Sequence, residues 1–415
     1  GSEPKFPNAS IVRSINHLYR TSGEDFYASM LTKTLVEMSE GEIWDDVDGG
    51  FFRHCAQADW TQPQHEKMLD DNLNLTRQFL NAGILLERPE FTETAKQTIK
   101  YLLNQLYDST ALGFRGSQGA HSEYYSLPAE IRAESGAPNP DPSCYANSNA
   151  LAVTVLLDAA WKLGDMSIHH TALQILGNLD TMAQSGSFSH VYTAEGPSSV
   201  PALFTDWAWL LTALIQAHGN TANDSYLTRA LSVAQLMIEN YFDQEGGGFF
   251  DIAEQDDQIG HLTVREKALA DNTVAAEAFI RLYQTTRNND YRQIAEATLS
   301  AFVEGYRESG EFAAEYGLTV HLLKNRVIEV TVEGNPEDVK CQELVAAAAR
   351  LPQPNVDIKT VIAGKDDPTP RAHVCLDTVC LPPVDSPEGL AQAVSELTYE
   401  QDSHFQDIFK VFPSN

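Results

Sequence analysis

Two kinds of apolar pattern alternate along most of this chain. In residues 91–106 the apolar side chains recur at helical spacing and charged side chains fill the other positions, so the predicted helix has one apolar and one polar face. Residues 150–163 and 207–217 are apolar almost all round, as expected for helices that are surrounded by other helices. We therefore expect amphipathic outer helices to alternate with apolar inner helices.

A glycine followed by an aromatic residue recurs after the amphipathic segments. The phenylalanines of this phrase are 63, 74, 61 and 63 residues apart. The five copies are Gly50-Phe51, Gly113-Phe114, Gly186-Ser187-Phe188, Gly248-Phe249 and Gly310-Glu311-Phe312. A fixed period predicts a repeated structural unit, and short turn and cap signals at 164–167, 223–226 and 288–291 predict that the unit is an antiparallel helical hairpin.

Five hairpins and a further apolar segment at 315–323 give about eleven predicted helices, close to the twelve of a six-hairpin toroid, the (α/α)6 barrel. An open solenoid is the alternative. Near residue 326 the pattern changes to short alternating or β-branched runs in the order β-α-β-β-α. The sequence thus predicts a mostly α barrel at 1–323 and a small α/β module at 324–415. In the module, the C-x4-C pair Cys375 and Cys380 favours structural thiols over a metal site or a disulfide.

Charge and composition limit the classes of partner that the chain can bind. The chain has 415 residues, with 28 Lys and Arg against 58 Asp and Glu, and its net charge of −30 repels nucleic acid and anionic lipid. No apolar stretch is long enough to span a membrane. We therefore expect a small-molecule ligand or a protein partner, and a cytoplasmic or organelle-soluble location. Five cysteines favour a reducing compartment.

The segment from Asp48 to Asn72, DGGFFRHCAQADWTQPQHEKMLDDN, carries a family resemblance. It resembles the GGF-R-Y-S-D-W-P-H-F-E-K-M-L-Y-D-N signature of the spermatogenesis-associated protein 20-like family. EPKFP at 3–7, FTDWAWLLTALI at 204–215, GGGFFD at 246–251 and HVCLDTVCLPP at 373–383 are similar to further family segments. The resemblance implies a six-hairpin barrel related to sugar isomerases, preceded in the family by a thioredoxin-like domain that would lie before residue 1.

The chain departs from the family pattern within the signature loop. Residue 64 is Gln where the family has His, and His65 replaces the family's Phe. The loop also has His54, Cys55 and Gln57 in place of the family's Tyr, Ser and Asp. If the family's histidine carries protons, this chain has lost that group. His65 is the alternative to that group, although its ring would point in another direction, because adjacent helical residues point about 100° apart.

The candidate site residues gather where the inner helices begin. Helix N-termini favour polar or anionic ligands, and facing carboxylates raise one another's pKa. The candidate catalytic residues are Asp71, Asp206 and Asp271. The candidate ligand-binding residues are Arg53, Trp60, His65, Glu66, Lys67, Asn72, Asn149 and Asn272. The alternative is that the Asp and Asn residues are ordinary helix caps, that Trp60 is a core residue, and that Arg53 locks its loop to a carboxylate.

Further chemistry is weakly signalled. His190, His218 and His321 lie at helix or loop ends, where two could converge as an acid/base pair. The chain has no phosphate-binding glycine loop, zinc-binding helix motif or nucleophile elbow, so we predict neither a cofactor nor a metal. Three hypotheses follow: a sugar epimerase, isomerase or glycosidase-like enzyme; a decayed pseudoenzyme that still binds a ligand; and an assembly scaffold.

Overall fold

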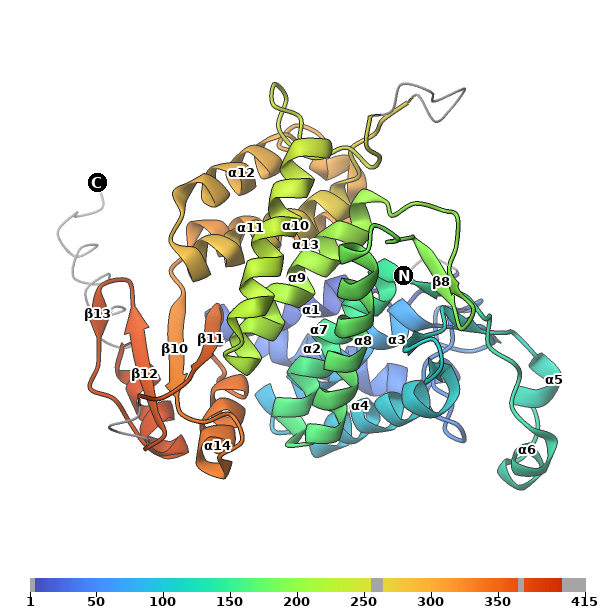
Figure 1. Ribbon diagram of the computed structural model, residues 1–415. Coiled ribbons are helices and arrows are strands. Elements are labelled where there is room, and N and C mark those ends of the chain that lie inside the picture. Colours follow the sequence, from blue (N-terminus) through green and yellow to red (C-terminus); the bar gives the residue numbers. More distant parts are fainter. Residues whose placement is uncertain (1–3, 255–263, 365–368, 398–415) are drawn as a thin grey trace, which may run out of the picture.

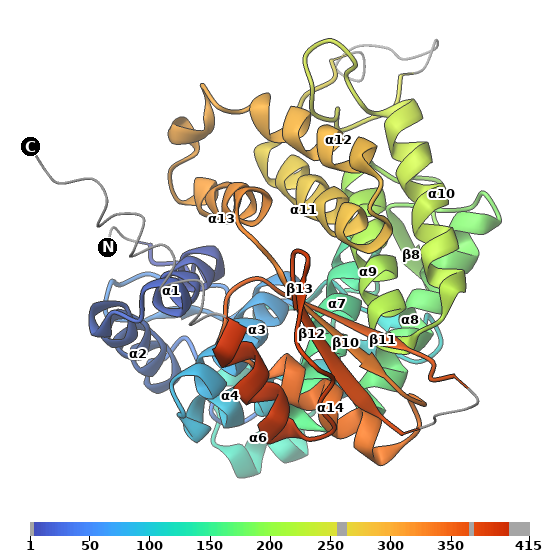
Figure 2. The ribbon, with the colours of Figure 1, turned by 90° about the vertical axis from the view of Figure 1, so that its left-hand side faces the viewer.

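Helical hairpins form a ring in the computed structural model, which describes residues 4–254, 264–364 and 369–397 (Figure 1). The helices that line the ring are α1 (Ala9–Ser22), α3 (Leu69–Leu85), α7 (Ala146–Leu163), α9 (Phe204–Thr221), α11 (Leu269–Thr286) and α13 (Ala313–Lys324). Each packs against the next, and α13 packs against α1, so the ring is closed (Figure 2). This confirms the predicted barrel and excludes the open solenoid.

An outer layer of helices covers the ring. Its members are α2 (Asp25–Glu40), α4 (Pro89–Tyr101), α8 (Met166–Gln184), α10 (Asp224–Asn240) and α12 (Asn289–Ser300). The turns from inner to outer helices are short and capped as the sequence signals. Asp165, Asn223 and Asn288 each accept a hydrogen bond from a backbone N–H of the following first turn. Residues 326 onward enter the module where a sixth outer helix would otherwise follow α13.

The connections from outer back to inner helices are longer and lie together at the opposite end of the barrel (Figure 1). They contain short elements only. These are β1 (His54–Cys55), β2 (Pro63–Gln64), β3 (Lys67–Met68), η1 (Leu102–Leu106), β4 (Tyr107–Asp108), β5 (Gly113–Phe114), β6 (Ser117–Gln118), α5 (Ser122–Tyr125), α6 (Ala129–Ser135), β7 (Cys144–Tyr145), β8 (Val191–Thr193), β9 (Gly196–Pro197) and η3 (Tyr306–Phe312). The recurring glycine-phenylalanine phrases lie in these connections.

The module is a four-stranded sheet of order β11-β10-β12-β13, with α14 (Val339–Ala349) as a crossover. Its strands are β10 (Ile328–Glu333), β11 (Val356–Val361), β12 (Arg371–Leu376) and β13 (Val379–Cys380). β10 pairs parallel with β11 and antiparallel with β12, and residues 387–397 are helical. The module stands at the short-turn end of the ring, where α14 packs on α7 and β11 on α9 (Figure 2). Residues 398–415 of the predicted module lie outside the described residues.

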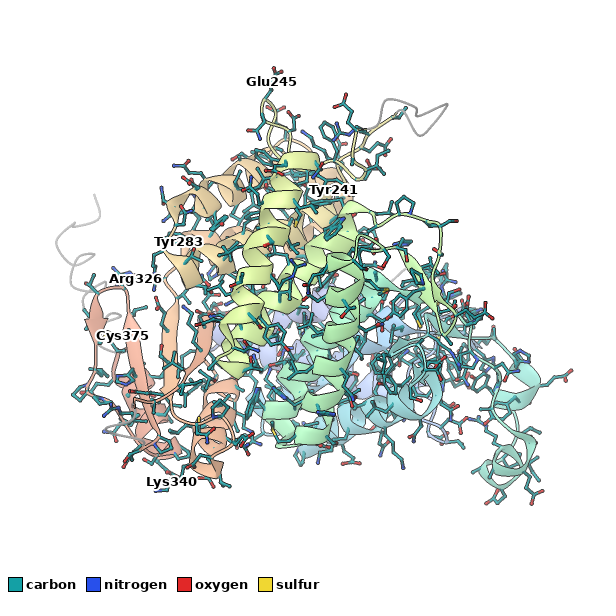
Figure 3. All side chains as sticks on the ribbon, in the orientation of Figure 1. Tyr241, Glu245, Tyr283, Arg326, Lys340 and Cys375 are labelled. Carbon is teal, nitrogen blue, oxygen red and sulfur yellow. A yellow bond between two sulfur atoms is a disulfide. The ribbon has the colours of Figure 1, made fainter. Side chains whose placement is uncertain are left out.

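Cys375 and Cys380 form a disulfide across the β12–β13 hairpin, whereas the sequence favoured free thiols. The two residues face each other in the antiparallel register, with Cα atoms 4.1 Å apart, which is close enough for a bridge. Cys375 lies toward the outer edge of the sheet, two strands away from β11, the strand that packs on α9 (Figure 3). The cysteines Cys55, Cys144 and Cys341 are buried, and burial raises the pKa of each thiol. In the described ranges, no helix has the length and apolar character that a membrane span requires.

Candidate functional site

A cavity of about 640 Å³ runs along the barrel between the inner helices. At its loop end, where the inner helices begin, it is lined by Asn8, Asp71, Asp271 and Phe312. At its module end, where these helices finish, it is lined by Asn220 and Thr285 together with Val345, Asp357 and Lys359 of the module. The wall between combines charged and amide groups with the indoles of Trp161 and Trp209. Concave sites that mix apolar surface with a few polar groups are the usual form of small-molecule sites.

Two carboxyl groups line the loop end of this cavity. Asp71 and Asp271 are both the third residue of an inner helix, and α3 and α11 are opposite members of the six-helix ring. Burial raises the pKa of Asp71 to about 6, and the neighbouring charge of Asp70 adds to the shift. Burial also raises the pKa of Asp271, against a hydrogen bond from Thr205. A raised pKa makes a carboxyl group better able both to accept and to donate a proton near neutral pH.

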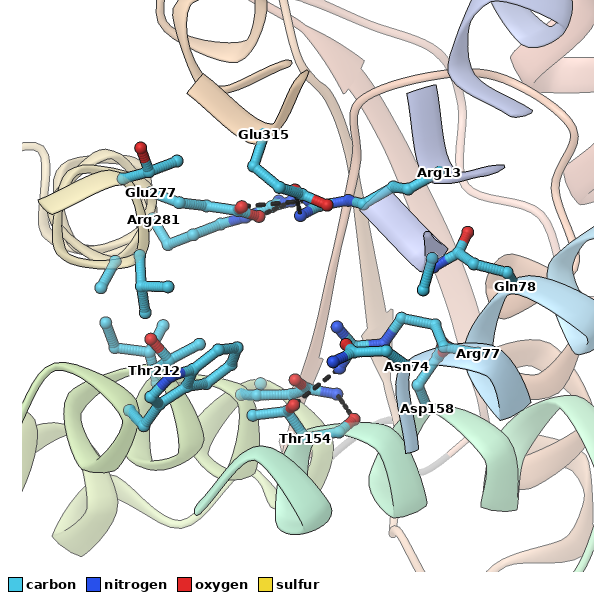
Figure 4. A pocket seen from close by; sticks show the side chains of 18 of the residues that line it. Arg13, Asn74, Arg77, Gln78, Thr154, Asp158, Thr212, Glu277, Arg281 and Glu315 are labelled. Atoms are coloured by element: carbon cyan, nitrogen blue, oxygen red, sulfur yellow. Dashed lines mark hydrogen bonds and ion pairs between the residues drawn. The ribbon is translucent and has the colours of Figure 1, made fainter. Parts of the chain in front are cut away.

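An unbroken series of ion pairs of alternating sign lines another part of the wall. Its members, in order, are Glu315, Arg13, Glu277, Arg281, Asp357 and Lys359 (the first four in Figure 4). Arg13 of α1 bridges to α11 and α13, with 3.0 Å to Glu277, and thereby ties the closing helices of the ring together. The Arg281–Asp357 pair, at 3.8 Å, joins the ring to the module. Each charge in the series has an opposite neighbour.

Arg77 lies on the other side of the cavity, on α3. Its guanidinium donates a hydrogen bond of 2.6 Å to Thr154 Oγ1, and Asp158 lies nearby (Figure 4). Asn74 and Gln78 share its helix face and also line the cavity. Burial lowers the pKa of Arg77, because nearby carboxylates offset only part of the desolvation.

Asp206, the third predicted catalytic residue, is fully buried outside the cavity lining. Its carboxylate accepts backbone hydrogen bonds from Leu203 at 2.7 Å and Asn147 at 3.0 Å, and it lies 3.0 Å from His190 Nδ1. The hydrogen bond to Asp206 raises the pKa of His190. Asp206 occupies the same helix position as Asp71 and Asp271, yet its carboxylate accepts the backbone N–H of the N-cap residue Leu203 at the start of α9 and ties that helix to α7.

The three predicted asparagines hold the glycine-phenylalanine turns. Asn72 Oδ1 accepts a hydrogen bond from the Phe51 backbone N–H at 2.7 Å, and its Nδ2 donates to the Phe51 and Met68 carbonyls. Asn149 bonds to Phe114 and Tyr145 in the same way, and Asn272 to Phe249 and Ala268. All three are buried. We call this arrangement the asparagine clamp; it ties three of the five copies of the phrase to the first turns of inner helices.

The remaining predicted ligand residues lie in the signature loop, away from the cavity lining. Lys67 is fully buried, and its Nζ contacts Asp45 Oδ2 at 2.7 Å and the Gly49 carbonyl at 2.6 Å. Arg53 pairs with Glu66 at 2.7 Å on the surface, so the guanidinium locks its loop.

Two rings complete that loop. Trp60 is buried at a positive φ of 65°, with the Lys5 ammonium 4.1 Å from its ring centre. The His65 ring stacks on Tyr125 and lies 3.1 Å from Ser122 Oγ. Both rings have protein partners outside the cavity, and their roles toward a ligand stay predictions.

The three histidines considered from the sequence lie apart. His190 contacts Asp206, His218 lines the module end of the cavity, and His321 lies 3.1 Å from His17. Burial lowers the pKa of His17 to about 4 and also lowers that of His321. The converging pair is thus His17 with His321, outside the cavity lining. Within the described ranges, no group of three or more His, Cys, Asp or Glu side chains could hold a metal ion.

Sequence reasoning missed the charged residues in the middle of the cavity. A signal was present, because the inner helix α3 carries polar residues at 71, 74 and 77–78, which form a stripe on the side of the helix that lines the cavity. On α11 the same stripe runs through 271, 277 and 281. A polar stripe on an inner helix therefore indicates the wall of a hollow ring.

A closed ring of parallel inner helices with antiparallel outer partners defines an (α/α)6 toroid. The chain shares this fold with solved sugar-converting enzymes: a D-mannose isomerase (TM-score 0.60, 11% identity, covering 72% of this chain and 76% of that one) and a sugar epimerase from a ruminal bacterium (TM-score 0.57, 12% identity, 72% and 75%). A GH76 α-mannanase from Bacteroides thetaiotaomicron is also similar (TM-score 0.53, 12% identity, 72% and 74%). At these identities the likeness concerns the fold.

Sequence comparison adds more specific relatives. Rat spermatogenesis-associated protein 20 is 29% identical over 124 residues, which are 29% of this chain and 16% of that protein. An uncharacterized protein from Caenorhabditis elegans, B0495.5, is 31% identical over 111 residues, 26% of this chain and 14% of that one. The matches thus span less than a fifth of these relatives. They confirm the resemblance to the spermatogenesis-associated protein 20-like family, although no protein-family model matches the chain.

Proposed function

We propose that this chain binds a sugar-like polyol in the central cavity and transfers protons to and from it through Asp71 and Asp271. The observation that carries the proposal is the position of two cavity-lining carboxyl groups of raised pKa on opposite members of the helix ring. Such a pair suits inversion at a carbon next to a carbonyl. One carboxylate removes the proton from one face, and the opposite carboxyl group returns a proton to the other face.

The cavity lining supports a polyol as the ligand. Asn74, Gln78 and Gln216 offer amide groups for hydroxyls, and Trp209 offers an apolar surface for the C–H face of a ring. The isomerase and the epimerase that share the fold act, by their names, on such compounds. Opposed carboxyl groups would also serve an inverting glycosidase, in which one acid protonates the leaving oxygen and the other activates a water.

The proposal is tested by incubating the protein in D2O with D-mannose, D-glucose, D-fructose and cellobiose. Proton NMR would report exchange at the carbon next to the carbonyl and the appearance of the epimer or isomer. We expect one of these sugars to react, and Asp71→Asn to lower the rate by about 10²- to 10⁴-fold, the usual contribution of a general acid or base. Asp290→Asn, at an exposed position on α12, is the matched control and should keep the full rate.

A binding protein without turnover is the second candidate. It is favoured by Gln64, which stands where the family's signature has His, and by the distance of the cavity histidine His218, at the module end, from Asp71. Thermal-shift titration with the same sugars separates the two. Stabilisation without exchange or product supports a pseudoenzyme, whereas neither stabilisation nor reaction with any sugar or with mannan oligosaccharides overturns the polyol site itself.

A further inference from the structure

Three basic side chains lie near the Asp158 carboxylate between α1, α3 and α7, and Arg77 is also influenced by the charges of Glu277 and Glu315. Lys162 Nζ lies 2.7 Å from Asp158, and the charge of Asp158 also acts on Arg20 and Arg77. Their other hydrogen bonds go to neutral groups: Arg20 to the Leu351 carbonyl, Arg77 to Thr154, and Lys162 to Asn81. Burial lowers the pKa of all three bases, with only partial compensation. Of these three bases, Arg77 lines the cavity, whereas Arg20 and Lys162 lie outside the lining.

The other cavity cations are balanced. Arg13 lies between Glu277 and Glu315, Arg281 lies between Glu277 and Asp357, and Lys359 pairs with Asp357 at 3.1 Å. Arg77 is the cavity-lining base that, among the described residues, has no carboxylate within ion-pair distance.

The chemistry of Arg77 indicates which kind of ligand group it would bind. A guanidinium presents five N–H donors in a planar fork that matches a carboxylate or a phosphate, and Thr154 accepts from one of its nitrogens. Asn74 and Gln78 flank it on the cavity wall (Figure 4). At a rise of 1.5 Å per residue, Arg77 lies about 9 Å along α3 from Asp71. A ligand could therefore contact both groups at opposite ends.

We propose that the cavity takes a polyol that carries an oxyanion, either a carboxylate or a phosphate, with the oxyanion bound by Arg77 and the reacting carbon near Asp71 and Asp271. This rests on the proposed function, since it names the substrate class of the same site. The proton chemistry is unchanged, because the oxyanion serves to orient the molecule along the barrel. A neutral sugar would leave the Arg77 charge uncompensated.

The test compares matched neutral and anionic ligands by calorimetric titration of the full chain. The pairs are D-glucose with D-glucuronate and with D-glucose 6-phosphate, and D-mannose with D-mannose 6-phosphate; inorganic phosphate probes the anion alone. We expect at least one anionic member to bind about 10-fold or more tightly than its neutral partner, the gain typical of charge-assisted hydrogen bonds. Inorganic phosphate should bind more weakly than the phosphorylated sugar.

Variants of Arg77 test whether this side chain causes the preference for anionic ligands. Arg77→Gln should weaken the anionic ligand by about 10- to 100-fold and change the neutral sugar by less than about 2-fold. Its unliganded melting temperature should stay equal or rise, because an uncompensated buried charge is removed; a purely structural arginine would lower it. Arg292→Gln, on the outer helix α12, is the control and should change neither affinity. Arg77→Lys keeps the charge but loses the fork, and should be intermediate.

The outcomes separate the two proposals. Neutral sugars that bind as tightly as anionic ones overturn the oxyanion site and leave the polyol site standing. Anionic preference that survives in Arg77→Gln and Arg77→Lys also overturns it. Inorganic phosphate that binds as tightly as the sugar phosphate would indicate an anion site without a polyol and contradict the proposal. Failure of every sugar, neutral or charged, overturns the proposed function as well.

Discussion

Two loops nearly 200 residues apart are held by the same kinds of side chain, but these side chains are buried in one loop and partly exposed in the other. In the first, Asp45, Lys67 and Asn72 hold Gly49 to Phe51; in the second, Asp243, Lys267 and Asn272 hold Gly247 to Phe249. Both lysine-to-aspartate distances are 2.7 Å. The side chains of Lys67 and Asp45 are 0% and 1% exposed, whereas those of Lys267 and Asp243 are 21% and 25% exposed.

The difference in depth comes from the connection between α4 and α7. Its residues Tyr125 and Arg132 cover the first loop: Arg132 adds a second ion pair to Asp45 at 2.7 Å, and aromatic rings surround the Lys67 ammonium. Burial lowers the pKa of Lys67 to about 8. The hydrogen bond from Lys267 lowers the pKa of Asp243 to about 2. The same motif is thus a buried charge network in one copy and a surface clasp in the other.

The largest effect should separate the two lysines. Lys67→Met leaves the Gly49 carbonyl without its buried donor and removes one of the two ion-pair partners of Asp45, and we expect a loss of about 3–5 kcal/mol in the free energy of unfolding. Lys267→Met, the matched variant, removes a partly exposed pair and should cost about 1 kcal/mol or less. Urea denaturation followed by circular dichroism measures both. Equal losses in the free energy of unfolding would show that burial does not decide how much each lysine contributes to stability.

The clamps themselves should behave alike, because Asn72 and Asn272 are equally buried and make the same three hydrogen bonds. Asn72→Ala and Asn272→Ala each leave a buried backbone N–H unpaired, and we expect each to cost about 2–3 kcal/mol. Asn149→Ala provides a third copy. The same denaturation experiment applies, and a loss under about 0.5 kcal/mol in any copy would remove the asparagine from the explanation of the repeat.

The smallest effect concerns Asp71, which precedes Asn72 and faces the charges of Asp70, Arg53 and Glu66. Its folded pKa of about 6 lies above its ordinary value of 3.8, so the native state binds this proton more tightly. The associated stability is complete below about pH 4 and is lost as the pH rises through 6. Asp71→Asn should therefore be more stable than the natural chain at pH 7, by on the order of 2 kcal/mol.

Melting temperatures of both proteins between pH 4 and pH 8 test this prediction. The gap should open across pH 4–6 and stay constant above. Asp271→Asn should show a gap of the same sign, because burial also raises the pKa of Asp271. A variant that is less stable than the natural chain at pH 7 would mean that the Asp71 carboxylate has a stabilising partner.

Much of the fold could be predicted because the repeat is local. The alternation of amphipathic and apolar helices, the turn signals and the recurring Gly-Phe phrase indicate hairpins, and the asparagine clamp gives three copies of that phrase their physical basis. The direction of a side chain at a helix start could not be predicted in the same way. Asp71, Asp206 and Asp271 share one helix position, but Asp206 turns back to cap its own helix while the other two line the cavity.

The middle of the cavity was harder to foresee. Arg13 contacts Glu315 from 302 residues away, and Asp357 reaches the ring from the module. No local pattern links such partners, because their contact depends on where the ring closes and on how the module docks. The disulfide between Cys375 and Cys380 was easier to predict from the sequence, because it depends only on the register of one hairpin.

The ion pair between Arg13 and Glu315 joins the two helices that close the ring, so it also bears on when the barrel can be completed during biosynthesis. Because α13 is the second neighbour of α1 in the ring, the ring of a nascent chain stays open until nearly everything up to Lys324 has left the ribosome. Until then the side of α1 that α13 will later cover stays exposed, and the cavity has no complete wall. Chaperone dependence and co-translational aggregation should therefore centre on the earliest hairpin.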